Sequence, residues 1–204
     1  MGFEYSVSAV GAVVMQNAVN ALGSVAIAAQ TTGEKIRQMF TLPMESVGMA
    51  MATYTAQNYG AGRLDRIKSG IKSSLLIQYI YCIAAWVVIF FAKAGLVALV
   101  LGENTSPVAE GALEYLTRIS VLFAFHGSLM VFRNTLQGMG YSIQAVVSGI
   151  GELIGRSMGA ALAFTELGFV AICYTNPISW VVALCYCIAM VCWYLHKLNK
   201  QTSF

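Results

Sequence analysis

The stretch SSLLIQYIYCIAAWVVIFFA, residues 73–92, contains no charged residue. About 20 mostly apolar residues are enough for an α-helix to cross the hydrocarbon core of a bilayer. Two further stretches without charge, residues 5–33 and 167–195, are longer still. These three stretches predict an all-α membrane protein with several spans.

The composition of the whole chain supports this class. Of its 204 residues, 58% are hydrophobic and only 10% are charged, with a mean hydropathy of +0.69, whereas soluble domains carry about 25% charged residues. No hydrolase, metalloprotease or phosphate-loop motif occurs, and the chain has only two histidines. The five cysteines lack a CxxC pair and are interpreted as apolar packing residues. We therefore expect neither an enzyme nor a cofactor or metal site.

Six helices are predicted where apolar stretches end at glycine, proline, asparagine or charged residues. Their ranges are 5–29, 37–59, 66–93, 110–136, 142–165 and 178–197. Pro43 is expected to kink the second helix unless neighbours satisfy the freed carbonyl, and Asn176 and Pro177 are expected to precede the sixth. All six helices would form a single transmembrane lobe.

Basic residues near helix ends predict the orientation, because they resist translocation. They gather after the second predicted helix and at the end of the chain: Arg63, Arg66, Lys68, Lys72, Lys197 and Lys200. We expect this side, with the C-terminus, to face the cytoplasm across a plasma membrane, such as the bacterial cytoplasmic membrane. The basic loop is expected to contact anionic lipid headgroups rather than nucleic acid.

Four stretches, taken in order, resemble the multidrug and toxic-compound extrusion (MATE) family. They are QNAVNALGSVAIAA (16–29), TLPMESVGMAMATYTAQNYGAGRLDRIKSGIK (41–72), FRNTLQGMGYS (132–142) and GELIGR (151–156). The pattern is similar to helices seven to twelve of a twelve-helix transporter. The resemblance implies a C-terminal six-helix lobe, with the N-terminal lobe absent from this chain.

The resemblance also implies a function. MATE transporters export organic, often cationic, drug-like compounds by alternating access, against an inward proton or sodium gradient. Because one lobe cannot form the cleft between two, we expect the missing lobe or a second copy of the chain as partner. Two alternatives stay open: a truncated membrane fragment that does not transport, and half of a related lipid-linked oligosaccharide flippase.

Ionisable residues inside a bilayer are costly and mark functional sites, so Glu4, Glu45 and His126 are candidates for proton or cation coupling. By resemblance, Glu4 matches an acidic ligand early in the family's seventh helix; alternatively it is an interfacial residue at a helix N-terminus. Glu45 follows Pro43, where a kink would open a polar pocket. His126 stands where the sodium-coupled branch has an aspartate, and a histidine suits protons better; alternatively it is a buried histidine that does not titrate.

Two further sets of polar residues are candidates. The first, which would line a cavity or bond neighbouring helices, comprises Gln16, Asn17, Asn20 and Gln30. The second is a gate or structural set made of Arg133, Asn134, Glu152 and Arg156. We expect Arg133 and Asn134 to pin the cytoplasmic closure, with the Arg133 fork reaching across lobes.

The segment SGIGELIGRSMGA, residues 148–160, places Glu152 one helical turn before Arg156. The two charges are expected to pair inside the bundle, because they are costly when unpaired in a membrane. Gly151, Gly155 and Gly159 share another face of the same helix and predict a close helix–helix contact.

Overall fold

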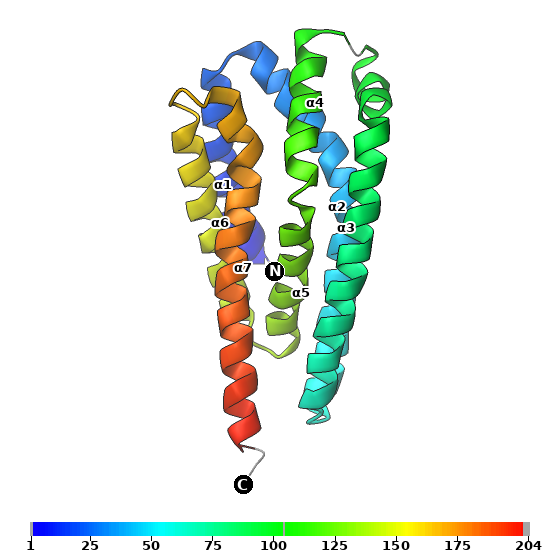
Figure 1. Ribbon diagram of the computed structural model, residues 1–204. Helices are drawn as coiled ribbons and strands as arrows, with labels where there is room; N and C mark the ends of the chain where they lie inside the picture. The colour runs from blue at the N-terminus through cyan, green and yellow to red at the C-terminus, as the bar shows by residue number, and fades with distance from the viewer. Residues whose placement is uncertain (1, 104, 202–204) are drawn as a thin grey trace.

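The computed structural model describes the backbone of residues 2–103 and 105–201, and the side chains of residues 10–103 and 105–200. Within these ranges the chain forms helices and no strands (Figure 1). The helices are α1 (Gly2–Ala21), α2 (Ser24–Gly60), α3 (Leu64–Leu101), α4 (Pro107–Ser120), α5 (Phe123–Gly138), α6 (Ser142–Leu162) and α7 (Gly168–Gln201). With α4 and α5 counted as one bent element, they confirm the predicted all-α, six-helix lobe.

The first turn of the chain lies earlier than predicted. We expected a break between residues 29 and 37, but the chain turns at Leu22 and Gly23, and α2 is continuous from Ser24. Gly23 has a φ of 93°, which favours glycine. Residues 30–36 stay helical because Gly33 packs tightly against the Tyr115 ring. The charges of Glu34 and Arg37 also pair along the helix.

The predicted helix 110–136 is broken in the middle. Val121 and Leu122 separate α4 from α5, and the two helix axes differ by 54°. The amides of Leu122 and Phe125 bond carbonyls three residues earlier, at 3.0 and 3.1 Å, as in a 3₁₀ turn. No proline or glycine stands at this break, so the local sequence carries no signal for it.

Proline interrupts neither of the two helices that contain it in their interior, α2 and α7. α7 begins at Gly168 rather than at the predicted residue 178, and it runs through Pro177. Next to this proline, the Ser179 hydroxyl donates to the Asn176 carbonyl at 2.6 Å. In α2, Tyr81 and Gln78 of α3 donate to the carbonyls of Phe40 and Met44, on either side of Pro43, at 3.0 and 2.9 Å. These hydrogen bonds hold the backbone next to the two prolines; the carbonyls that the prolines leave without their helical donors are those of Met39 and Cys173, four residues earlier.

The other predicted boundaries differ by less. α3 continues eight residues past Lys93, to Leu101 (101 − 93 = 8), because it ends at Gly102, which caps it in the left-handed conformation. α6 spans 142–162 against the predicted 142–165.

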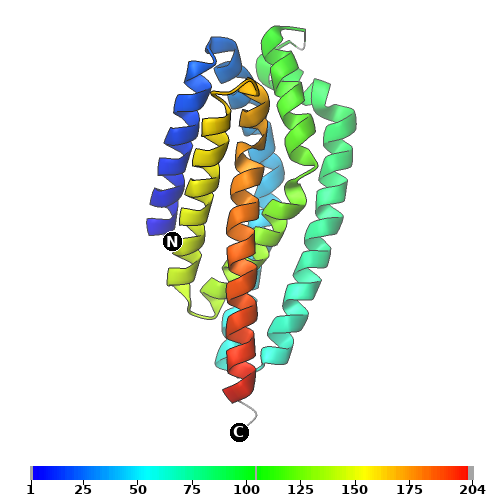
Figure 2. The same ribbon diagram turned by 60° about the vertical axis from the view of Figure 1, so that its left-hand side comes forward.

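The helices pack as two groups joined in the centre. α1, α6 and α7 lie side by side, and α2 to α5 form the other group (Figures 1 and 2). The predicted glycine face of α6 packs directly on α7: a methyl group at Gly155 would collide with the Ser179 backbone, and one at Gly159 would lie 2.7 Å from the Thr175 Cα. The expected close contact is confirmed at Gly155 and Gly159, whereas a methyl group at Gly151 would make an ordinary contact, 3.5 Å from the Ala183 Cα.

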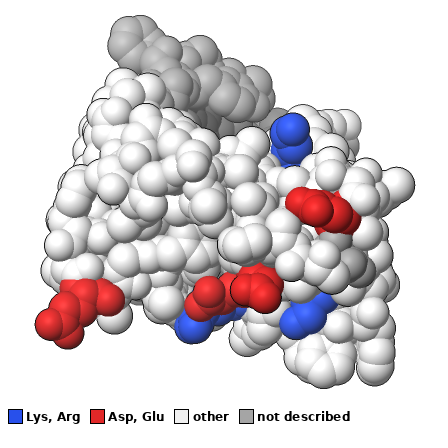
Figure 3. All heavy atoms as spheres, turned by 90° about the horizontal axis from the view of Figure 1, so that it is seen from above, with Lys and Arg blue, Asp and Glu red and all other residues white. Residues whose placement is uncertain are grey.

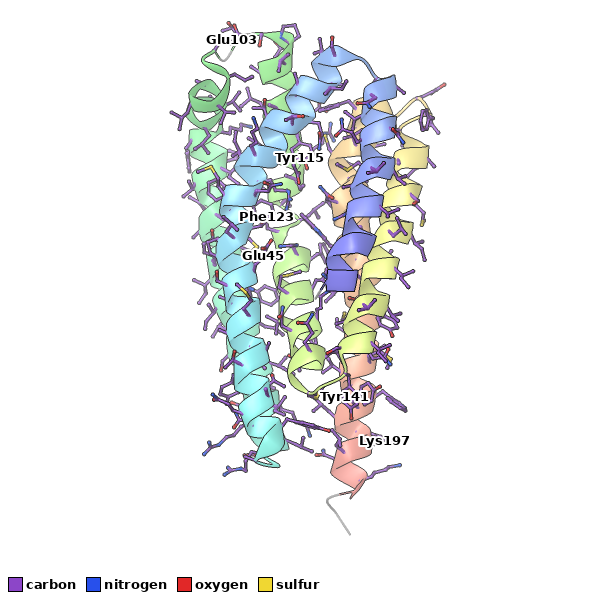
Figure 4. The ribbon with its side chains drawn as sticks, turned by 180° about the vertical axis from the view of Figure 1, so that it is seen from behind. Glu45, Glu103, Tyr115, Phe123, Tyr141 and Lys197 are labelled. Atoms are coloured by element: carbon purple, nitrogen blue, oxygen red, sulfur yellow. The ribbon has the colours of Figure 1, made fainter. Side chains whose placement is uncertain are left out.

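Among the described residues, α3 and α7 are long and apolar enough to cross a membrane, and the bent pair α4–α5 passes the same test when it is counted as one span. The α2–α3 turn and the C-terminus lie at one end of the bundle (Figure 1). Lys197 lies towards this end and Glu103 at the other (Figure 4). The Glu103 end carries both acidic and basic side chains (Figure 3). The basic run 63–72 and the basic C-terminal residues therefore share one end, as the predicted orientation requires.

Candidate functional site

A cluster of polar side chains is buried where the two helix groups meet. Its centre is the Tyr115 hydroxyl of α4, which donates to the Glu34 carboxylate of α2 at 2.7 Å. The Asn176 amide of α7 donates to the same hydroxyl at 3.3 Å. The cluster thus links α2, α4 and α7, and Tyr115, which lies in the half of the bundle nearer Glu103, is completely buried (Figure 4).

The charge of Glu34 is balanced within its own helix. Arg37, one turn later, donates to both Glu34 oxygens, at 2.5 and 2.8 Å, and this fork holds the carboxylate in place. The Arg37 guanidinium also lies 5.8 Å from the Trp180 ring centre on α7. Tyr115 and Trp180 thus hold this ion pair from two other helices, at the junction of the two helix groups.

Two of the predicted coupling candidates meet beside this cluster. The Nε2 atom of His126, on α5, lies 4.0 Å from Oε1 of Glu45 on α2, which is beyond hydrogen-bond distance. His126 is buried against the Trp180 ring, at 4.8 Å between ring centres, and neither of its ring nitrogens has a hydrogen-bond partner among the described residues. The Glu45 side chain is 47% exposed. The pair therefore joins the interior of the lobe to its surface.

A second ionic group lies between α5 and α6. Arg133 donates to the Ser148 hydroxyl at 2.9 Å and to the Glu152 carboxylate, while Arg156 donates to the other Glu152 oxygen at 3.4 Å. The expected pairing of Glu152 with Arg156 is present. Arg133 differs from expectation, because its side chain is buried inside this lobe and its fork is occupied by α6. Asn134 donates to the Met130 carbonyl of its own helix, at 2.8 Å.

The expected polar side of the first helix is split by the turn at Gly23. Gln16 donates to Asn20 at 3.0 Å on α1, and both Asn17 and Asn20 are exposed. Gln30 belongs to α2 and is buried. The four residues therefore do not form one lining. The side chain of Glu4 lies outside the described residues.

Glu34, Arg37, Tyr115 and Asn176 were missed as functional candidates, because the predicted turn placed Glu34 in a loop and Arg37 at the first residue of the next helix, both near the surface. A Glu–Arg pair three positions apart is typical of a continuous helix. The three-residue spacing of Glu34 and Arg37, directly after the uncharged run that ends at Gly33, could have indicated that the helix continues through this region. Tyr115 and Asn176 have no distinctive sequence context, and only the packing of α4 and α7 brings them together.

Long apolar helices that enclose buried charged and polar side chains are typical of a polytopic membrane protein. A family model described as MatE matches residues 1–158, which is more than half of the chain. The chain belongs to the MatE family, and the predicted resemblance is confirmed.

Similar proteins agree with this assignment. The chain is 24% identical over 169 residues to "Probable multidrug resistance protein YoeA" of Bacillus subtilis (strain 168), covering 81% of this chain and 36% of that protein. A crystal structure of a MATE protein in the bent conformation superposes with a TM-score of 0.88 at 14% identity, covering 99% of this chain and 45% of that one. The structure of an inward-facing multidrug resistance MATE family transporter superposes with a TM-score of 0.86 at 15% identity, covering 97% of this chain and 46% of that one.

These structures show that the fold is that of MATE transporters. The chain spans about a third of the curated relative's length and less than half of each of the two structures. It therefore corresponds to a half-sized lobe of that fold.

Proposed function

We propose that this chain is the C-terminal lobe of a secondary active multidrug exporter. It would work with a second six-helix lobe, either an N-terminal partner or another copy of itself. The two lobes would carry organic, often cationic compounds outward by alternating access, using an inward proton or sodium gradient. The protein is thus a transporter rather than an enzyme, and its C-terminus would lie in the cytoplasm.

The observation that carries this proposal is the contact between His126 and Glu45. An antiporter needs a group that exchanges its ion with one side and then influences the packing of its helices. Glu45 is half exposed on α2, whereas His126 is buried on α5 against Trp180 of α7. Protonation of His126 would place a positive charge among helices from both groups.

The same pair favours a proton over sodium as the coupling ion. Sodium is a hard cation that prefers oxygen ligands, whereas an imidazole exchanges protons near neutral pH. Glu45 is the carboxylate beside His126, while Glu34 is held by Arg37 and Tyr115. Glu45 and His126 would therefore bind the proton, with Glu34 holding the surrounding structure.

Efflux from membrane vesicles tests the proposal. The chain is expressed alone and joined to a second lobe, and export of a fluorescent organic cation is measured under an imposed pH gradient or an imposed sodium gradient. We expect export that depends on the pH gradient and on His126. Absence of gradient-dependent export from every assembly that inserts correctly would instead support a membrane fragment that does not transport.

A further inference from the structure

A cavity of about 350 Å³ lies between α3 and the break that separates α4 from α5. Its walls are Tyr79, Cys82, Ile83 and Trp86 of α3, and Ser120, Val121 and Ala124 at the break. The break stands beside α3 in both views of the ribbon (Figures 1 and 2). This volume is within the range of small-molecule sites, about 300–1,000 Å³. The cavity plays no part in the polar cluster or in the His126–Glu45 pair.

Two polar contacts between helices bound the cavity along α3. On one side the Tyr79 hydroxyl lies 3.1 Å from the Ser128 hydroxyl of α5. On the other, Lys93 donates to the Thr117 hydroxyl of α4 at 2.7 Å. Lys93 follows Tyr79 by 14 positions (93 − 79 = 14), or about 21 Å along the helix. Between these contacts the 54° bend separates the helices and leaves a window with two closed ends.

The mouth of this window faces the apolar side of the lobe. Ile83 and Val121 at its edge are 65% and 62% exposed, and α3 is one of the two helices apolar enough to span a membrane alone. Phe91, two turns beyond Ile83 on α3, is also highly exposed. The window therefore opens sideways into the hydrocarbon layer that surrounds α3, rather than toward either aqueous end.

The walls offer a water molecule few polar partners. A buried water needs two to four polar partners. Here the Tyr79 hydroxyl already bonds Ser128, and the Ser120 hydroxyl lies 3.5 Å from the Thr117 carbonyl. The side chains of the other five lining residues are apolar except for the Trp86 indole N–H and the Cys82 thiol, and the thiol behaves as a small apolar group. An empty space of this size would also lose the dispersion contacts of its walls.

We propose that this window is a binding site for one hydrocarbon chain of a membrane lipid. The chain would enter past Ile83 and Val121 and lie against Cys82 and Ala124. It would lie against the break between α4 and α5 and thereby stabilise the bent form over a straight one. The inference requires membrane insertion, but it does not depend on transport by the chain.

The test uses the full chain in vesicles that contain a phosphatidylcholine with a photoreactive diazirine in the middle of one acyl chain. After illumination, mass spectrometry locates the labelled residues. Cys82 is buried and lines the window, whereas Phe91 reports contact with bulk lipid. Cys187, buried in the core, reports background. We expect labelling at Cys82 and Phe91 and none at Cys187.

Filling the window should remove the labelling of Cys82 and leave that of Phe91 unchanged. Ala124→Phe is expected to abolish labelling of Cys82 and to leave Phe91 labelled. The same substitution at the exposed Ala161 of α6 is the matched control and should change neither. Ile83→Trp, which narrows the mouth from an exposed position, tests the same point without altering the core. Labelling of Cys82 that persists in both window variants would overturn the proposal.

Two further outcomes would also contradict it. Labelled Phe91 with Cys82 at the level of Cys187 would mean that lipid chains do not enter the window. Labelling of Cys82 by a small apolar diazirine without a headgroup, but not by the lipid, would assign the window to a small apolar molecule instead.

Discussion

The Nε2 atom of His126 lies 4.0 Å from Oε1 of Glu45, although 81 positions (126 − 45 = 81) separate the two residues in sequence. One member of the pair is buried and the other is half exposed. This is the only contact between two of the predicted coupling candidates in the part of the chain that the structure describes. The proposed coupling mechanism depends on it.

Removing either member of this pair should uncouple export from the pH gradient. Coupling between two binding events is typically worth about 1–3 kcal/mol, or about 5–150-fold in affinity. We expect Glu45→Gln and His126→Ala each to reduce gradient-driven efflux within that range, and the double variant to lose no more than the worse single one. Efflux is measured at matched expression. Glu103→Gln, exposed at the end of the bundle, is the control and should transport normally.

Exchange of Glu152 and Arg156 should fail to restore the protein. If Glu152 and Arg156 contacted only each other, exchanging them would rebuild the ion pair. Here Arg133 also contacts Glu152, so the exchange would bring a second buried guanidinium against that of Arg133. Loss of one partner of a buried ion pair costs about 3–5 kcal/mol, and we expect a loss of at least this size from the exchange. Thermal unfolding in detergent measures it; recovery of wild-type stability would show that Arg133 is unimportant to the pair.

Gly155→Ala should destabilise the packing of α6 on α7. The added methyl group would collide with the Ser179 backbone, which cannot rotate away as a side chain can. Overpacking of this kind costs about 1–3 kcal/mol. Gly151→Ala is the matched control, because its methyl group would meet the Ala183 Cα at an ordinary 3.5 Å. Equal melting temperatures for the two variants would contradict a close contact at Gly155.

Tyr115→Phe should weaken the link between α2, α4 and α7. The variant keeps the ring against Gly33, but it removes the hydroxyl that donates to Glu34 and accepts from Asn176. Leaving a buried polar group unsatisfied costs about 1–3 kcal/mol. Tyr174→Phe removes a hydroxyl that accepts from Arg118 at a more exposed position, and it should lower the free energy of unfolding by less. Unfolding curves of the two variants give the comparison, and equal losses would mean that the buried hydroxyl is not a structural link.

Hydropathy and helical spacing predicted more of the structure than turn signals did. The uncharged stretches predicted the helical lobe, and the four-residue spacing in 148–160 predicted both the glycine contact and the Glu152–Arg156 pair. These features depend only on the helical repeat. Turn signals misplaced the first turn, since Gly33 resembles a helix end until Tyr115 packs on it.

The sequence predicted some residues of the candidate site but not their contacts. Glu45 and His126 stood out because ionisable residues are rare in apolar segments. Their proximity, and the second partner of Glu152, arise from the packing of α5 on α2 and α6, which no local pattern encodes. The break at Val121 is likewise set by tertiary packing, because its sequence contains no helix-breaking residue.

The central claim, that this chain is a lobe of a proton-coupled exporter, is tested most directly by efflux of an organic cation from vesicles under a pH gradient alone and under a sodium gradient alone. The chain is measured with its second lobe, as wild type and as His126→Ala. We expect efflux under the pH gradient that is lost in His126→Ala, and little efflux under the sodium gradient. Efflux driven by sodium and unchanged in His126→Ala would contradict the account.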